Sequence, residues 1–229
     1  MKKIVFCIFI ALCFAGIILW QLFSKNTSYY LVSVLVLIVS MMPFFLFFEL
    51  KKQSAREVSL VAGLIAVAVV SRAVFYLIPQ VKPIAAVVIV SGVCLGAGRG
   101  YIVGAFSAFV SNFIFGQGVW TPFQMVALGA VGFAAGVIFS KLKAGSRISL
   151  AAVGFVLVFV LYGLIVDTCT VITVNTQFSL ESVVAVYAAG APFNLVFAAA
   201  TAVFLFVFGQ PFAKKVNRLC TKYGIIQKG

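Results

Sequence analysis

The sequence contains no histidine and only four acidic residues among its 229. The absence of histidine excludes His-based catalytic dyads, histidine metal ligands and histidine proton relays. Four scattered carboxylates form no recognisable acid–base dyad or divalent-metal site. A P-loop motif is also lacking, so the chain does not hydrolyse ATP by that route. We therefore predict that the protein is not an enzyme and carries no metal and no cofactor.

Charged residues of either sign are scarce, and apolar residues dominate. The chain is 64% hydrophobic and 9% charged, with a mean hydropathy of +1.23. A soluble domain of this length is not expected to be so apolar, so we predict a polytopic membrane protein. Eight apolar runs are present, at roughly Ile4–Phe23, Tyr29–Leu50, Glu57–Ile78, Ile84–Ala97, Gly100–Phe115, Thr121–Ser140, Ile148–Val174 and Val183–Phe208.

The fourth and fifth runs are short, with about 15 residues each against the ~20 that a membrane-spanning helix needs. A single helix from Ile84 to Phe115 would be about 48 Å long at ~1.5 Å per residue. It would also place Arg99 near its middle, where a charge is unfavourable. We therefore expect two separate helices here.

The distribution of basic residues between loops agrees with a topology of eight membrane spans. With the N-terminus inside, inner segments hold fourteen of the 17 basic residues, whereas the outer loops hold only Lys25 and Lys82. This positive-inside bias predicts a multi-pass cell-membrane protein with both termini in the cytoplasm. We attribute the net charge of +13 to this topology and do not expect a nucleic-acid partner.

The first apolar run has two interpretations. Lys2 and Lys3 before an apolar stretch resemble a signal peptide. The stretch is about 20 residues long, however, and no Ala-x-Ala cleavage site follows it, so we expect an uncleaved anchor.

A polar cluster stands out between Ser111 and Gln124. It brings together amides, hydroxyls and an aromatic ring in an otherwise apolar region. Polar groups in hydrocarbon are costly unless they find partners, and small-molecule sites combine aromatic faces with a few fixed polar groups. With Gly116–Trp120 as an outer loop and Thr121-Pro122 as a helix start, we expect one wall of an outward-facing pocket. Its predicted residues are Asn112, Gln117, Trp120, Thr121 and Gln124.

Two charged residues lie inside predicted spans. Arg72 and Asp167 both fall in the outer halves of their helices. Intramembrane charges either pair with one another or face a polar cavity, and both alternatives stay open for these two. Small residues at helical spacing also occur. Gly132 and Gly136 predict close helix packing, whereas Ala62 and Ala66, near the inner end of their helix, could equally dock a partner protein.

The segment Ser111–Met125 resembles one found in substrate-binding S-components of energy-coupling factor vitamin transporters, and it is most similar to the cobalamin-type branch. Arg72 with Phe75, Pro83 before an apolar run, and the small residues from Gly98 to Ala108 support this resemblance. The likeness covers roughly Glu57 to Phe208.

The resemblance implies an all-α polytopic membrane protein with a six-helix bundle plus two extra N-terminal transmembrane helices. Its expected parts are two additional spans in 1–56, a substrate-binding membrane domain in 57–209 and a basic cytoplasmic tail in 210–229. S-components bind a vitamin from outside and lack ATPase activity. They dock through small residues of their first helix, here Ala62 and Ala66, onto a transmembrane coupling protein carried by two ATPases.

We therefore predict the membrane-embedded substrate-binding subunit of a vitamin importer, with cobalamin as the expected substrate. Weaker candidates for the pocket are Arg72, Tyr76 and Asp167. Alternatives are an S-component for another vitamin such as riboflavin, or a self-sufficient secondary transporter or channel, although no inverted repeat or set of intramembrane acids is evident. A membrane enzyme would need a catalytic constellation, for which only a Ser–Lys pairing stays open. In a structural assembly factor the polar cluster would merely satisfy backbone groups.

Overall fold

The structure is a computed structural model that describes residues 34–36, 38–39, 54–141, 146–174 and 179–225. These residues form helices joined by short connections and contain no β-strand. The predicted all-α polytopic membrane bundle is confirmed. Its helices are α3 (Ala55–Val74), α4 (Ile84–Leu95), α5 (Ala97–Phe115), α6 (Thr121–Lys141), α7 (Arg147–Val156), η1 (Leu157–Tyr162), α8 (Gly163–Val174), α9 (Leu180–Phe204), η2 (Leu205–Gly209) and α10 (Gln210–Lys222).

Several of these helices are long and apolar enough to cross a membrane. By length and composition, the described residues contain four such helices, at Ala55–Val74, Thr121–Ser140, Arg147–Thr173 and Leu180–Lys222. The two predicted N-terminal spans lie almost wholly outside the described residues, and so does most of the predicted 1–56 unit.

The chain reverses between α4 and α5 at one residue, Gly96. Its φ of 89° lies in the region that glycine adopts readily and other residues rarely adopt. Two separate helices were expected here, but the connection is shorter than predicted, since Arg99 already lies in the first turn of α5. With only 12 residues, α4 is about 18 Å long at ~1.5 Å per residue and does not reach across a ~30 Å hydrocarbon core.

Glycines bring α4, α5 and α6 into backbone contact. A Cβ atom on Gly100 would lie 2.5 Å from the Gly132 carbonyl oxygen, and one on Gly136 would lie 2.5 Å from the Ala97 nitrogen. A Cβ atom on Gly132 would collide with the Gly100 carbonyl oxygen. The close helix packing predicted at Gly132 and Gly136 is therefore confirmed, and this is the usual role of such residues between membrane helices.

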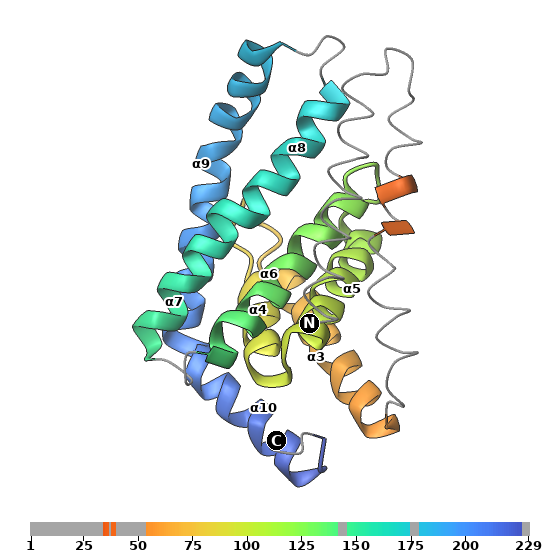
Figure 1. Ribbon diagram of the computed structural model, residues 1–229, viewed down its shortest axis with the longest axis vertical. Coiled ribbons are helices and arrows are strands. Elements are labelled where there is room, and N and C mark those ends of the chain that lie inside the picture. The colour runs from red at the N-terminus through yellow and green to blue at the C-terminus, as the bar shows by residue number, and fades with distance from the viewer. Residues whose placement is uncertain (1–33, 37, 40–53, 142–145, 175–178, 226–229) are drawn as a thin grey trace.

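The last helix extends beyond its predicted end. The apolar run was expected to stop near Phe208, with a basic tail after it, but α9, η2 and α10 form one continuous helix from Leu180 to Lys222. The apolar face of α10 packs on the bundle through Val216 and Cys220, while its lysines and arginine are exposed. In Figure 1, α8 and α9 run side by side, and α10 lies at the far end of the bundle.

An ion pair joins the N-terminal ends of α3 and α5. Glu57 in the first turn of α3 pairs with the guanidinium of Arg99 in α5, and Arg99 also donates to the Leu95 carbonyl oxygen at 2.9 Å.

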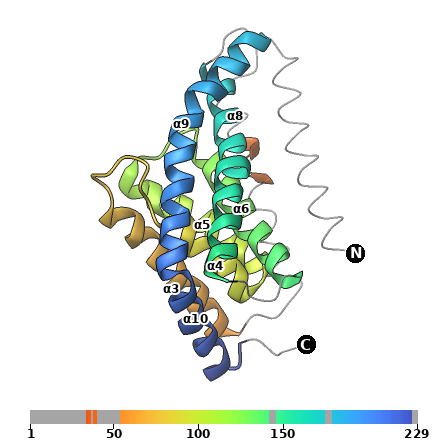
Figure 2. The same cartoon turned by 90° about the vertical axis from the view of Figure 1, so that its left-hand side faces the viewer.

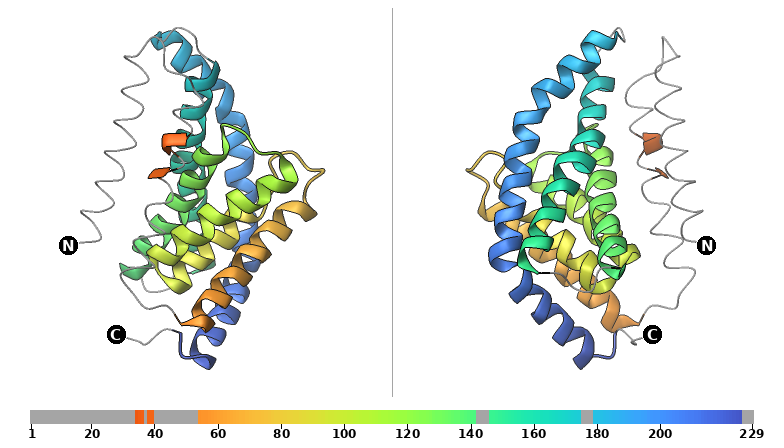
Figure 3. Two further views of the ribbon diagram at one scale, coloured as in Figure 1. Left: turned by 90° about the vertical axis from the view of Figure 1, so that its right-hand side faces the viewer. Right: turned by 60° about the vertical axis from the view of Figure 1, so that its left-hand side comes forward.

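The α3–α4 and α5–α6 connections meet at the other end of these helices. The Tyr76 and Phe115 rings lie 5.2 Å apart, and the Arg72 guanidinium lies 4.2 Å from the centre of the Phe115 ring. Figures 2 and 3 show the α3–α4 loop well away from α10. The basic α10 and the two loops therefore occupy opposite ends of this part of the bundle.

Candidate functional site

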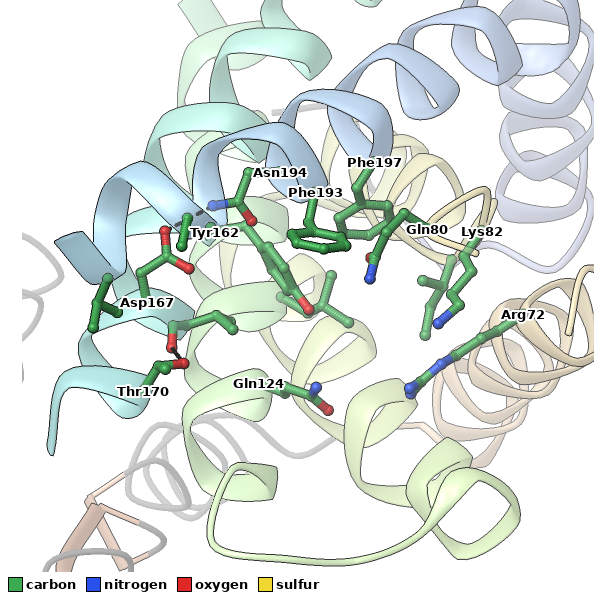
Figure 4. Close-up of a pocket in the computed structure, with 16 residues that line it drawn as sticks. Arg72, Gln80, Lys82, Gln124, Tyr162, Asp167, Thr170, Phe193, Asn194 and Phe197 are labelled. Carbon is green, nitrogen blue, oxygen red and sulfur yellow. Dashed lines mark hydrogen bonds between the residues drawn. The ribbon is translucent and has the colours of Figure 1, made fainter. Parts of the chain in front are cut away.

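A cavity of about 430 Å³ lies between the α3–α4 connection and helices α6, η1, α8 and α9. Its volume falls within the ~300–1,000 Å³ typical of small-molecule sites. Figure 4 shows that its polar side chains gather at two ends, with aromatic rings between them. The cavity is thus shaped for a ligand with a flat apolar middle and polar groups on either side.

Cations and amides occupy the first end. Arg72 reaches it from the last turn of α3, where the helix dipole favours a positive charge. Lys82 and Gln80 come from the α3–α4 connection, and Gln124 comes from the first turn of α6. Gln80 has a φ of 59°, a left-handed conformation that residues with a side chain adopt only when their surroundings hold it.

A carboxylate and an amide occupy the second end. Asp167 on α8 is buried and accepts a 2.8 Å hydrogen bond from Asn194 on α9. The two helices can approach here because Gly190 has no side chain, since a Cβ atom there would lie 2.5 Å from an Asp167 carboxylate oxygen. Gly163 likewise leaves room for Asn194. This end offers acceptor oxygens to a hydrogen-bond donor on a ligand.

Three aromatic rings line the middle of the cavity. Tyr162, the last residue of the π-helical segment η1, packs edge-on against Phe197 of α9 with ring centres 5.0 Å apart. Phe193, one turn earlier on α9, also lines the cavity. In Figure 4 the Tyr162 hydroxyl points toward the side on which Gln80, Lys82, Arg72 and Gln124 lie. Aromatic faces of this kind stack on flat conjugated ligands.

A hydrogen-bonded network supports the cationic end from behind. Asn112, only 1% exposed, accepts from Arg72 at 2.9 Å through its carbonyl oxygen. Its amide nitrogen donates to Gln124 at 2.8 Å and to Thr121 at 3.1 Å. One buried amide therefore fixes the positions of an arginine and a glutamine that face the cavity.

The predicted pocket residues divide into three groups. Arg72, Gln124 and Asp167 line the cavity. Asn112 and Thr121 are buried in the supporting network and are not among its lining residues. The remaining three are exposed and lie off the cavity wall: Gln117, Trp120 and Tyr76.

The exposed three have other contacts. Gln117 donates to the Phe109 carbonyl oxygen and accepts from the Thr121 hydroxyl, which closes the α5–α6 loop. The Trp120 ring lies against Gly118, and Tyr76 packs on Phe115. These contacts shape the loops above the cavity rather than its wall.

Arg72 and Asp167 do not pair with each other. Arg72 donates to Ser111 at 2.5 Å and to Asn112, whereas the hydrogen-bond partner of Asp167 is Asn194. Figure 4 places the two charges at opposite ends of the cavity. Of the two alternatives left open by the sequence, the structure favours two separate charges that face a shared polar space.

Sequence reasoning missed most of the wall, because only three of the 16 residues that line the cavity were predicted. Gln80, Lys82, Tyr162, Phe193, Asn194 and Phe197 line the cavity but were not predicted. Asn194 and Tyr162 carried a usable signal, because a polar group within an apolar helix needs a partner or a cavity. Phe193 and Phe197 carried no such signal, since phenylalanine is common throughout this chain, with 25 copies.

Comparison with known proteins gave one match. A family model described as "ECF-type riboflavin transporter, S component" matches residues 52–215, well over half of the 229-residue chain. Searches of curated proteins and of solved structures found no match.

Proposed function

Since the chain belongs to the family of ECF-type riboflavin transporter S components, we propose that it binds riboflavin in the cavity between Arg72 and Asp167. The resemblance to S-components is confirmed by this membership, and the family is one of transporters rather than enzymes. The protein is thus the substrate-binding subunit of a vitamin transporter in the membrane. The identity of the vitamin and the residues that bind it are the subject of the proposal.

The side chains that line the cavity favour a flavin as the ligand. Its aromatic middle, formed by Tyr162, Phe193 and Phe197, suits a flat three-ring system. The amides of Gln80 and Gln124 can both donate to and accept from the hydroxyl groups of the ribityl chain. The acceptor oxygens of Asp167 suit the N–H group at the edge of the flavin ring.

Cobalamin, the vitamin expected from the sequence, fits this cavity less well. A corrin macrocycle with its amide arms and nucleotide loop is several times larger than a flavin, whereas the cavity holds about 430 Å³. The description of the matching family also favours riboflavin. The assignment to the cobalamin-type branch stays an untested prediction and forms one arm of the experiment below.

Flavin binding to the purified protein in detergent is the direct test. Riboflavin fluorescence should be quenched at micromolar protein or below, whereas cobalamin should not compete. Replacing Gln124 with leucine should weaken riboflavin binding about tenfold, because a ligand hydrogen bond is lost and an apolar group faces polar atoms. Binding of cobalamin but not riboflavin would overturn the substrate assignment.

Gln117 provides a matched control. It is the same residue type in the loop that leads into α6, but it is exposed and not part of the cavity wall. Gln117→Leu should therefore change riboflavin affinity by less than about threefold. Equal losses for the two leucine variants would mean that the polar cluster acts on ligand binding only through the fold.

We also propose that the small surface of α3 docks on the coupling protein of the transporter. Ala62, Gly63 and Ala66 are all exposed on this helix, and among the described residues no atom outside the helix's own backbone lies within 4 Å of a Cβ position on Gly63. Small residues allow close approach of a partner helix in the membrane. The coupling protein and two ATPases would supply the energy for uptake, because no ATP-binding motif is present in this sequence.

A bulky substitution tests this surface. Ala66→Phe should abolish riboflavin uptake by cells that contain the complete transporter, while riboflavin binding to the isolated protein stays unchanged. Ala199→Phe on α9, where the alanine is also exposed, should leave both unaffected. Uptake by the isolated chain in vesicles without ATPases would instead support a self-sufficient transporter.

A further inference from the structure

The end of the cavity formed by Arg72 and Lys82 has an excess of positive charge. Both side chains line the cavity and are partly buried. Asp167 is at the other end, where Asn194 holds it. Two cations thus share one end of a partly desolvated space, with the one carboxylate of the wall far from them.

Contacts to an aromatic ring hold both cations in place. The Arg72 guanidinium lies 4.2 Å and the Lys82 ammonium 5.7 Å from the centre of the Phe115 ring. Arg72 is fixed further by its hydrogen bonds to Ser111 and Asn112, which are neutral. These contacts orient the charges without neutralising them.

Neither cation has a carboxylate partner within the part of the chain that the structure describes, where Glu57–Arg99 is the ion pair. Burial lowers the pKa of Lys82, and the nearby charge of Arg72 lowers it further. Both effects disfavour the ammonium form of Lys82. A bound anion would instead stabilise the charged forms of both Arg72 and Lys82.

Other hydrogen-bond donors converge on the same end. Gln80 and Gln124 contribute amide N–H groups. The Tyr162 hydroxyl points toward them. Within the described residues the hydrogen bonds of Arg72 to Ser111 and Asn112 both come from Nη1, so its other N–H groups can donate to a ligand. Guanidinium, ammonium and neutral donors gathered in this way are what protein sites use to bind phosphate oxygens.

We propose that the Arg72–Lys82 end of the cavity is a subsite for a phosphate group on the substrate. This inference rests on the proposed flavin-binding function and narrows it, because the preferred substrate is then the 5′-phosphate ester of riboflavin rather than riboflavin itself. The phosphate oxygens accept from Arg72 and Lys82, and the flavin ring extends toward Phe193 and Phe197.

The test is a pair of fluorescence titrations, with riboflavin and with riboflavin 5′-phosphate, on the purified full-length chain. The wild-type protein should bind the phosphate ester at least as tightly as riboflavin. Lys82→Gln should weaken binding of the phosphate ester by at least about tenfold more than it weakens riboflavin binding, because only the ester presents an anion to the lysine. Lys82→Arg, which keeps the charge, should restore most of the loss.

Each other outcome counts against the subsite. Weaker binding of the phosphate ester than of riboflavin by the wild-type protein would overturn it and leave the proposed flavin-binding function intact. Equal weakening of both ligands by Lys82→Gln would also overturn it, since the lysine would then not recognise the anion. Binding of neither flavin would overturn the proposed function and this subsite together.

Discussion

Replacing Gly132 with alanine is expected to destabilise the protein by more than about 3 kcal/mol, at or beyond the upper end of the usual cost of overpacking a core. The added Cβ atom would collide with the carbonyl oxygen of Gly100 and approach the Val88 side chain to 2.9 Å. A backbone carbonyl cannot rotate away as a side chain can, so α5 and α6 must separate. Thermal unfolding in detergent, followed by size-exclusion chromatography, measures the effect.

Gly63 offers the matched control for this substitution. It is also helical, but a Cβ atom there would meet no other part of the described structure within 4 Å. Gly63→Ala should leave the midpoint of unfolding unchanged or raise it slightly, because alanine is favoured over glycine in helices by up to ~1 kcal/mol. Similar midpoints for the two variants would contradict backbone contact between α5 and α6.

Replacing Asn112 with leucine is expected to abolish high-affinity ligand binding although Asn112 does not line the cavity. The substitution removes one acceptor from Arg72 and one donor from each of Gln124 and Thr121. A buried hydrogen bond to a charged group contributes about 1.5–3 kcal/mol, so we expect a loss of roughly 3 kcal/mol in stability. Riboflavin affinity should fall by more than about tenfold, because Arg72 and Gln124 lose their fixed orientation.

Ser107 on the same helix provides a control for this substitution. It shows whether the effect of Asn112→Leu comes from loss of the hydrogen-bond network or from loss of any buried polar group. It is 0% exposed, and its hydroxyl makes no hydrogen bond within the described residues. Ser107→Ala should therefore be neutral or slightly stabilising and leave ligand binding unchanged. An Asn112→Leu variant that binds riboflavin as the wild type does would show that the network does not position the cavity wall.

Local features of the fold were predictable because they depend on short segments. The α5–α6 loop falls at Gly116–Trp120, and α6 begins at Thr121, as the Thr-Pro pair indicated. The separation of α4 from α5 also followed from length and from Arg99. The end of the last helix was harder to predict, because it lies beyond the apolar run. The residues of α10 are mostly polar, and this helix packs on the bundle.

The site was only partly predictable, because burial and direction depend on distant helices. The segment Ser111–Gln124 was identified as polar and clustered, yet only Gln124 from it reaches the cavity. Sequence spacing cannot tell a side chain that faces a ligand from one that supports it from behind, as Asn112 does. Asn194 meets Asp167 across 27 positions, and no local pattern predicts such a contact.

The helix that runs unbroken from Leu180 to Lys222 has a mechanical consequence. Its 43 residues make it about 64 Å long at ~1.5 Å per residue, roughly twice the hydrocarbon thickness of a bilayer. Phe193 and Asn194, which line the cavity, lie about a third of the way along this helix, and its C-terminal end carries the exposed basic residues of α10. A force that tilts α10 is therefore expected to shift the cavity wall as well, so we expect the affinity for a ligand to change with the tilt of this helix.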